Sequence, residues 1–274
     1  METGMVRRII AGLLVTAAPL LAVACSTPIQ HAVTVGATNP KLGNPGWIGS
    51  LSGGAPQTGK VTLSPPTAWK SANLLVLMAS LDGPDTQPVG KATGETHAIV
   101  GGTSGLSWTR LTHVSARQDW AAAGSKLEPY GASATEVWVA QVPVGWPATG
   151  TIMVADSQAT KDDGFVVTVV AYSNGKVNGV VTLDGLNGRP EVQRLTVPAC
   201  SSVYAATFFG KVNAAFTPER GYQAAVVRRA GDDTAATLAS TSHCLAASLQ
   251  AVGYTAPAPG NYWEMAIAIV SPAS

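Results

Sequence analysis

The stretch that decides the fold is Tyr262-Trp263-Glu264-Met265-Ala266-Ile267-Ala268-Ile269-Val270, close to the end of the chain. Its residues alternate in size, and one parity consists of Trp263, Met265, Ile267 and Ile269. Successive side chains of a β-strand point to opposite faces of a sheet, so this period of two predicts a strand with one packed face. A strand of this kind is typical of a β-sandwich.

Other segments carry the same strand signals between turn residues. Residues 74–78 and 165–170 are short apolar runs, typical of strands that are covered on both faces. Asn174-Gly175 joins two β-rich runs and suits the positive φ angles of a tight hairpin. Residues 245, 249 and 252 are Leu, Leu and Val at helical spacing, which predicts one short helix. We therefore expect an all-β, antiparallel two-sheet β-sandwich of about ten or eleven strands with little helix.

Residues 1–24 have the composition of an export signal. Arg7 and Arg8 precede the uncharged apolar stretch 9–21, which has the length of a signal peptide rather than of a membrane-spanning helix. The following Leu21-Ala22-Val23-Ala24-Cys25 resembles the end of bacterial lipoprotein signals, which more often carry Leu where this chain has Ala22. The resemblance implies cleavage after Ala24 and a diacylglycerol on the Cys25 thiol. The alternative is secretion without a lipid.

Residues 25–57 are rich in Gly, Pro, Ser, Thr and Asn and show little hydrophobic periodicity. Because such a composition buries too little apolar surface to offset chain entropy, we expect a flexible tether here. Residues 58–274 have a length that suits a single β-sandwich domain. The lipid on Cys25 would hold this domain at the outer face of the bacterial cytoplasmic membrane or in the cell envelope.

Cys200 and Cys244 are the two cysteines of the predicted domain. In an exported protein, an even pair predicts a disulfide.

The charge balance argues against a nucleic-acid partner. Residues 1–24 contain 2 of the 17 basic side chains and 1 of the 16 acidic ones, which leaves 15 of each in the mature chain. Nucleic-acid binding requires an excess of Lys and Arg to neutralise phosphates. We therefore expect no nucleic-acid partner.

Four segments follow one another in an order that resembles the jelly-roll sandwich modules of secreted proteins from high-GC bacteria and of phage tail proteins. They are residues 74–83, 104–109, 135–140 and the strand that contains Trp263. The resemblance covers residues 58–272. It implies a jelly-roll fold and a role in adhesion or display, and it implies no catalytic residues.

The chain contains no strong catalytic, metal or cofactor motif. Its four histidines form no H-E-x-x-H or Cys-rich pattern. Glu136 and Glu264 lie within predicted strands, where a jelly-roll hydrolase would place its two carboxylates, although a strand carboxylate usually faces solvent. The pairs Asp82/Asp85 and Asp162/Asp163 offer oxygen ligands in turns, but a calcium site needs six or more oxygens.

Trp120, Tyr130 and Trp146 lie in or beside polar connections between predicted strands. Loops on a rigid sandwich often carry binding residues, and an exposed indole can stack on a sugar or anchor a protein. The alternative is that these aromatics close the open end of the sandwich. We therefore expect a lipid-anchored module that binds a glycan or a surface protein. A phage- or prophage-encoded structural module and a carbohydrate-active hydrolase are the alternative functions.

Overall fold

The computed structural model describes residues 29–32, 45–56, 59–81, 96–115, 133–157, 164–186, 189–209, 217–230, 233–255 and 262–273. Within these residues the chain forms sixteen strands and one short 3₁₀ helix, η1 (Thr67–Ser71). The pairings between neighbouring strands are antiparallel. The predicted all-β, antiparallel sandwich with little helix is confirmed, but its described residues form sixteen strands in four sheets rather than ten or eleven strands in two.

Strands β2 to β9 form what we call the first sandwich. Its larger sheet has the strand order β2-β9-β4-β7-β6, and its smaller sheet has the order β3-β8-β5. The first strand therefore pairs with the last one, as in a jelly roll. The strands are β2 (Trp47–Pro56), β3 (Lys60–Leu63), β4 (Leu74–Leu81), β5 (Ala98–Gly101), β6 (Thr109–Val114), β7 (Ala134–Gln141), β8 (Ile152–Asp156) and β9 (Gly164–Tyr172).

Strands β10 to β16 form the second sandwich. Its larger sheet has the order β10-β16-β12-β14-β13, and its smaller sheet pairs β11 with β15. The short strand β1 (Ile29–Ala32) extends the larger sheet beside β10. The other strands are β10 (Gly175–Leu186), β11 (Glu191–Val197), β12 (Ser202–Phe209), β13 (Tyr222–Ala230), β14 (Asp233–Ser240), β15 (Ser248–Gly253) and β16 (Tyr262–Pro272).

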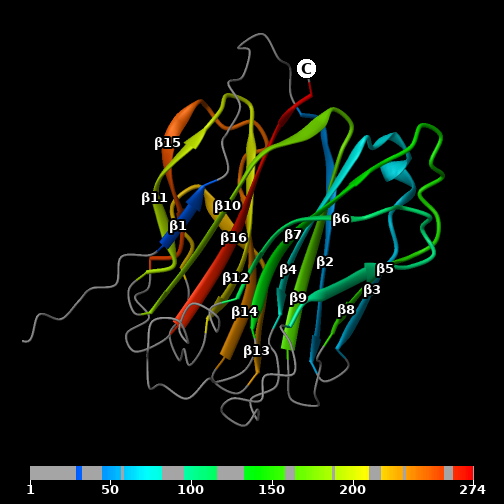
Figure 1. Ribbon diagram of the computed structural model, residues 1–274. Coiled ribbons are helices and arrows are strands. Elements are labelled where there is room, and N and C mark those ends of the chain that lie inside the picture. The colour runs from blue at the N-terminus through cyan, green and yellow to red at the C-terminus, as the bar shows by residue number, and fades with distance from the viewer. Residues whose placement is uncertain are drawn as a thin grey trace, which may run out of the picture.

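The four sheets stack as four layers, with the two larger sheets face to face in the middle (Figure 1). Apolar side chains from both larger sheets fill the space between these two sheets, among them Val76, Met78, Tyr204 and Ala268. One further apolar cluster fills the interior of each sandwich, between its larger and smaller sheets. Strands β4 and β9 are thus covered on both faces, which explains their uninterrupted apolar runs.

The larger sheets of the two sandwiches have the same topology, whereas β5 of the first sandwich has no counterpart among the described residues in the smaller sheet of the second. When β2, β4, β7 and β9 are matched to β10, β12, β14 and β16, the two larger sheets have the same strand order. Each of the two larger sheets also has a β-bulge in the first of these strands, β2 or β10. The bulge after Trp47 interrupts pairing with β9 at Tyr172, and the bulge after Val177 interrupts pairing with β16 at Val270. Tyr172 and Val270 are equivalent, because each faces the first residue of its central strand.

The edge strands β6 and β13 share a second bulge. In β6 it follows Arg110, which pairs with Trp138, and in β13 it follows Ala224, which pairs with Leu238. The contacts between the halves are also reciprocal, since β2 packs on β13 and β10 packs on β6. Bulges are specific features that related domains retain. The two sandwiches are therefore equivalent units, related by an approximate two-fold axis.

Strand β2 lies inside residues 25–57, the segment that the sequence predicts as a tether. Because several of its residues are glycines, the sequence shows no alternation of apolar and polar side chains. The glycines nevertheless fit the narrow space between the sheets. A Cβ atom on Gly53 would lie 2.7 Å from Cγ1 of Val61 in β3. This strand forms through backbone pairing with β9 and close packing, so its composition gives little sign of it.

The helix predicted around residues 245–252 is not formed. Residues 248–253 are strand β15, in which Val252 is buried in the second sandwich and Leu249 is 55% exposed. Pairing with β11 satisfies the backbone of this segment, and the helical spacing of its apolar residues does not correspond to a shared packed face.

Candidate functional site

Glu136 in β7 is a fully buried carboxylate, with 0% of its side chain exposed. It shares a strand face with Ala134 and Ala140, which pack inside the first sandwich, while Val137 packs on the opposite face between the larger sheets. The alternation of β7 therefore directs Glu136 inward. A buried carboxylate is stable only with hydrogen-bond partners, and its surroundings provide them.

Four groups contact the two oxygens of Glu136. Oε1 accepts a hydrogen bond from Nη1 of Arg110 at 3.1 Å and lies 2.8 Å from Nδ1 of His113. Oε2 accepts hydrogen bonds from Nε1 of Trp138 at 2.6 Å and from the backbone N–H of Ala98 at 3.2 Å. Glu136 thus holds a guanidinium, an imidazole and an indole in fixed positions. We call Arg110, His113, Glu136 and Trp138 the Glu136 cluster.

The bulge in β6 brings Arg110 and His113 to the same carboxylate. These residues are three positions apart, so a regular strand would place their side chains on opposite faces. Because the register shifts between Arg110 and Thr112, Arg110 pairs with Trp138 and His113 pairs with Glu136. Bulges often occur beside functional sites, where they redirect side chains in this way.

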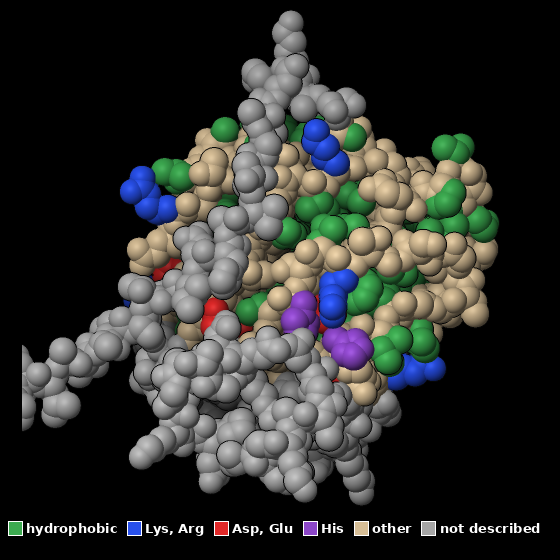
Figure 2. Space-filling view, in the orientation of Figure 1, with side chains coloured by type: hydrophobic (Ala, Val, Ile, Leu, Met, Phe, Trp, Pro, Cys, Tyr) green, Lys and Arg blue, Asp and Glu red, His purple; other side chains and the backbone are tan. Residues whose placement is uncertain are grey.

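The Glu136 cluster extends from the core to the surface along the edge strand β6. The side chains of Arg110 and His113 are 43% and 16% exposed, respectively. The guanidinium carbon of Arg110 lies 5.8 Å from the ring centroid of Trp138, which is half-buried. Figure 2 shows histidine, basic and acidic side chains side by side near the centre of the face where Figure 1 places β5 and β6. Solvent therefore reaches one side of the cluster.

The second sandwich has no such cluster at the equivalent positions. The strand pairing matches Glu136 with Ala236 and Trp138 with Leu238. On the edge strands it matches Arg110 with Ala224 and His113 with Val227. The equivalent strands of the larger sheet and the same bulge therefore form with apolar residues alone, in a sandwich whose described residues include no counterpart of β5. The fold does not require a buried charge here, and this indicates that the cluster has another role.

Glu136 and Glu264, the two carboxylates considered for a hydrolase, do not face each other. Glu264 shares its face of β16 with Ala266 and Ala268, which pack between the two larger sheets. Glu136 points into the first sandwich, on the other side of the larger sheet that contains β7. Both carboxylates are buried rather than on a solvent face. The first larger sheet lies between them, so they form no acid–base pair.

Trp146 does not lie on an exposed loop as the sequence suggested. It is 6% exposed, packs in the core of the first sandwich and donates its indole N–H to the carbonyl oxygen of Ser104 at 2.9 Å. Its glycine- and proline-containing neighbours in the sequence gave no sign of this burial. Trp120, Tyr130 and Cys25 lie outside the described residues, as do the aspartate pairs in the turns.

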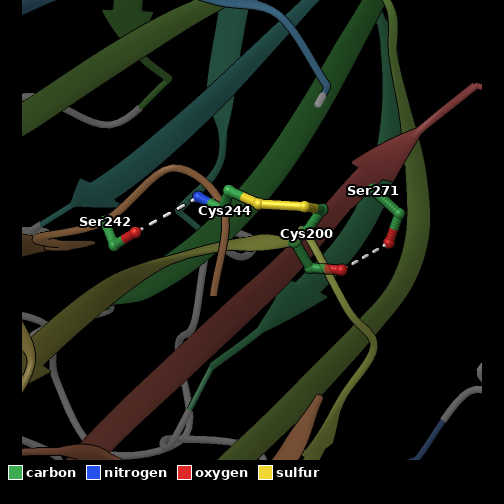
Figure 3. The surroundings of a disulfide bond; sticks show 5 residues. Cys200, Ser242, Cys244 and Ser271 are labelled. Carbon is green, nitrogen blue, oxygen red and sulfur yellow. Dashed lines mark hydrogen bonds between the residues drawn. A yellow bond between two sulfur atoms is a disulfide. The ribbon is translucent and has the colours of Figure 1, made fainter. Parts of the chain in front are cut away.

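Cys200 and Cys244 form a disulfide, as the sequence predicts (Figure 3). It ties the residue before Ser201 to the segment that leads into β15, and Ser201 bonds Ser271 of β16 through their Oγ atoms, 2.7 Å apart. The amide of Cys244 also donates a hydrogen bond to Oγ of Ser242 at 3.3 Å. The disulfide therefore fixes one end of the second sandwich.

Beside the disulfide, a row of aromatic rings joins the two sandwiches. Trp47 of β2 stacks on His243, with ring centroids 3.9 Å apart and an interplanar angle of 7°. Nδ1 of His243 lies 3.3 Å from the hydroxyl of Tyr204, which accepts a hydrogen bond from the hydroxyl of Tyr172 at 2.8 Å. Burial lowers the pKa of His243, so the neutral imidazole is favoured in this stack.

The described residues contain no group of three or more His, Cys, Asp or Glu side chains that could hold a metal ion. Within the same residues, no helix has the length and hydropathy that a membrane span requires. Comparisons with family models, with curated proteins and with solved structures found no match to this chain.

The sequence offered one signal for the Glu136 cluster. Residues 134–140 alternate so that Glu136 shares a face with Ala134, Trp138 and Ala140. A charge on an apolar face indicates a buried, partnered group rather than a solvent-facing one. Arg110 and His113 gave no such signal, because only the bulge brings them together.

Proposed function

We propose that this chain is a lipid-anchored envelope protein whose first sandwich binds a glycan at the Glu136 cluster. The observation that carries the proposal is the difference between the two sandwiches. At the positions of Glu136, Arg110 and His113 the second sandwich has Ala236, Ala224 and Val227, although its larger sheet forms the equivalent strands. Because a buried charge usually costs stability compared with apolar packing, its presence in one copy favours a role in recognition.

The chemistry of the cluster suits a hydroxyl-rich ligand. A guanidinium has five N–H donors in a rigid fork, and in Arg110 the contact with Glu136 is made through Nη1. Indole rings can stack on the apolar faces of sugars, and Trp138 is held by its N–H to Oε2 of Glu136. Fixed donors beside a fixed ring reduce the ordering cost of binding.

The export part of the proposal rests on residues 1–25 and on the disulfide. The resemblance of Leu21–Cys25 to lipoprotein signals implies a lipid on Cys25, and a disulfide is typical of proteins outside the reducing cytoplasm. Labelled palmitate in a bacterial host should appear in the wild-type protein and disappear with Cys25→Ser. Wild-type protein that is exported without label would contradict lipid attachment.

A panel of cell-wall and surface glycans tests the binding proposal. Wild-type protein should retain at least one glycan class, and Arg110→Ala should weaken retention when it is assayed well below its melting temperature, which falls because Glu136 loses a charged partner. Arg194→Ala is the matched control, because Arg194 is an exposed arginine in β11 of the second sandwich. Equal retention by wild type and Arg110→Ala, or no retention of any glycan by wild type, would refute the proposal.

A further inference from the structure

After the bulge at Trp47, the outer edge of β2 lacks the charges and prolines that usually protect an edge strand. Residues 49–55, Gly-Ser-Leu-Ser-Gly-Gly-Ala, contain no charge and no proline. The opposite edges do carry charges, since β6 contains Arg110 and β13 contains Arg228 and Arg229. Soluble proteins place charges, prolines or bulges on edges because unpaired backbone groups recruit other strands. An unprotected edge indicates that another strand covers it.

The equivalent edge in the second sandwich is occupied. Strand β1 pairs antiparallel with β10, and Gln30, His31 and Ala32 face Leu183, Thr182 and Val181. The matching bulges in β2 and β10 make residues 51–53 the equivalents of residues 181–183. Backbone of this shape therefore accepts an antiparallel strand. In the part of the chain that the structure describes, β2 is the last strand of its sheet on this side.

We propose that β2 pairs with β2 of a second copy of this chain. A two-fold axis between identical edge strands makes their pairing antiparallel, which is the mode that the β10 edge already shows. In such a pair, residues 49–55 of one copy lie opposite residues 49–55 of the other. A charged side chain in this segment would therefore lie close to the identical charge of the second copy and be repelled by it. Residues 49–55 have none. The two larger sheets of the first sandwiches would then form one continuous sheet across the dimer.

Side-chain size also favours this occupant. Ser50 and Ser52 are exposed, and the residue between them, Leu51, is half-buried on the other face. Gly49 and Gly53 have no side chains to block an approaching backbone. An edge of small, uncharged residues thus allows two copies to approach closely along their whole length.

Sedimentation across a range of concentrations tests the proposal on the full chain. Wild type should show a monomer–dimer equilibrium, and Ser50→Lys/Ser52→Lys should raise the dissociation constant by at least about tenfold through like-charge repulsion. Ser107→Lys/Thr109→Lys is the matched control, because both residues are exposed and lie just before and at the start of the edge strand β6. The control should dimerise like wild type, and circular dichroism should show that all three proteins are folded.

Hydrogen exchange provides a second readout. The amides of residues 50–53 should exchange more slowly as the wild-type concentration rises, while those of β6 should not change. A wild type that stays monomeric at its highest soluble concentration would overturn the proposal. So would a dimer that resists Ser50→Lys/Ser52→Lys, since it must then use another surface.

Discussion

Glu136→Leu should destabilise the protein strongly. Leucine has a similar size but accepts no hydrogen bond, so the N–H groups of Ala98 and Trp138 would lose their acceptor. An unsatisfied buried donor costs about 1–3 kcal/mol, so two of them predict a loss of about 2–6 kcal/mol in the free energy of unfolding. Arg110 is 43% exposed and can turn to water, so we assign it no further loss.

Urea denaturation with the disulfide intact measures this loss as a shift in midpoint at constant slope. Glu136→Gln should lose less than Glu136→Leu, because its carbonyl oxygen can still accept from Trp138 and Ala98 while its amide faces Arg110. Glu219→Gln is the control, since Glu219 is a half-exposed carboxylate, and it should change stability by less than about 0.5 kcal/mol. A leucine variant as stable as wild type would refute the assigned hydrogen bonds.

Three further predictions concern stability. Burial raises the pKa of Tyr204 to about 12, so the folded protein holds this proton more tightly than the unfolded chain does. The contribution of Tyr204 to the free energy of unfolding should therefore be fully present below about pH 10 and be lost as the pH approaches 12. Urea titrations at several pH values should show a smaller decline for Tyr204→Phe than for wild type. An equal decline in both proteins would contradict the assignment. A Cβ on Gly185 would lie 2.7 Å from the indole of Trp263, so Gly185→Ala should lower the free energy of unfolding by about 1–3 kcal/mol and with it the melting temperature. Gly101→Ala is the control, because Gly101 has open space around it, and it should not lower the melting temperature. Equal effects of the two substitutions would rule out the clash. Cys200→Ser opens a loop that spans 44 residues and should cost about 4 kcal/mol on the chain-entropy model, and a melting temperature that does not fall would argue against this contribution.

The sequence was most informative where one strand face carries large apolar residues. The alternation in residues 262–270 indicates which side chains of β16 pack inside the second sandwich, among them Trp263 and Ile267. The prediction of a single packed face was wrong, because Ala266 and Ala268 on the opposite face are buried between the two larger sheets. The apolar runs of β4 and β9 likewise indicated strands covered on both faces, which the four layers explain. These features depend on local spacing, so they can be read from the chain alone.

The features that the sequence did not predict depend on pairing between distant strands. The two sandwiches share their strand order in the larger sheets and the positions of their bulges. The residues at equivalent positions differ, as Glu136 and Ala236 do. Strand β2 is made of small residues, and its partner β9 provides the apolar side chains. Arg110 and His113 meet at Glu136 only because of the bulge, which the sequence pattern of β6 does not indicate.

The position of a bound glycan is the most direct test of the proposed site. Nitrogen-labelled protein titrated with a glycan retained on the panel should show a shift of the Trp138 indole N–H signal, because this group bonds to Glu136. The indole signals of Trp69 and Trp263, each 1% exposed, should not move. Trp138→Phe identifies the Trp138 signal by its loss. A saturating glycan that leaves the Trp138 signal in place, or shifts only signals from the second sandwich, would contradict a site at the Glu136 cluster.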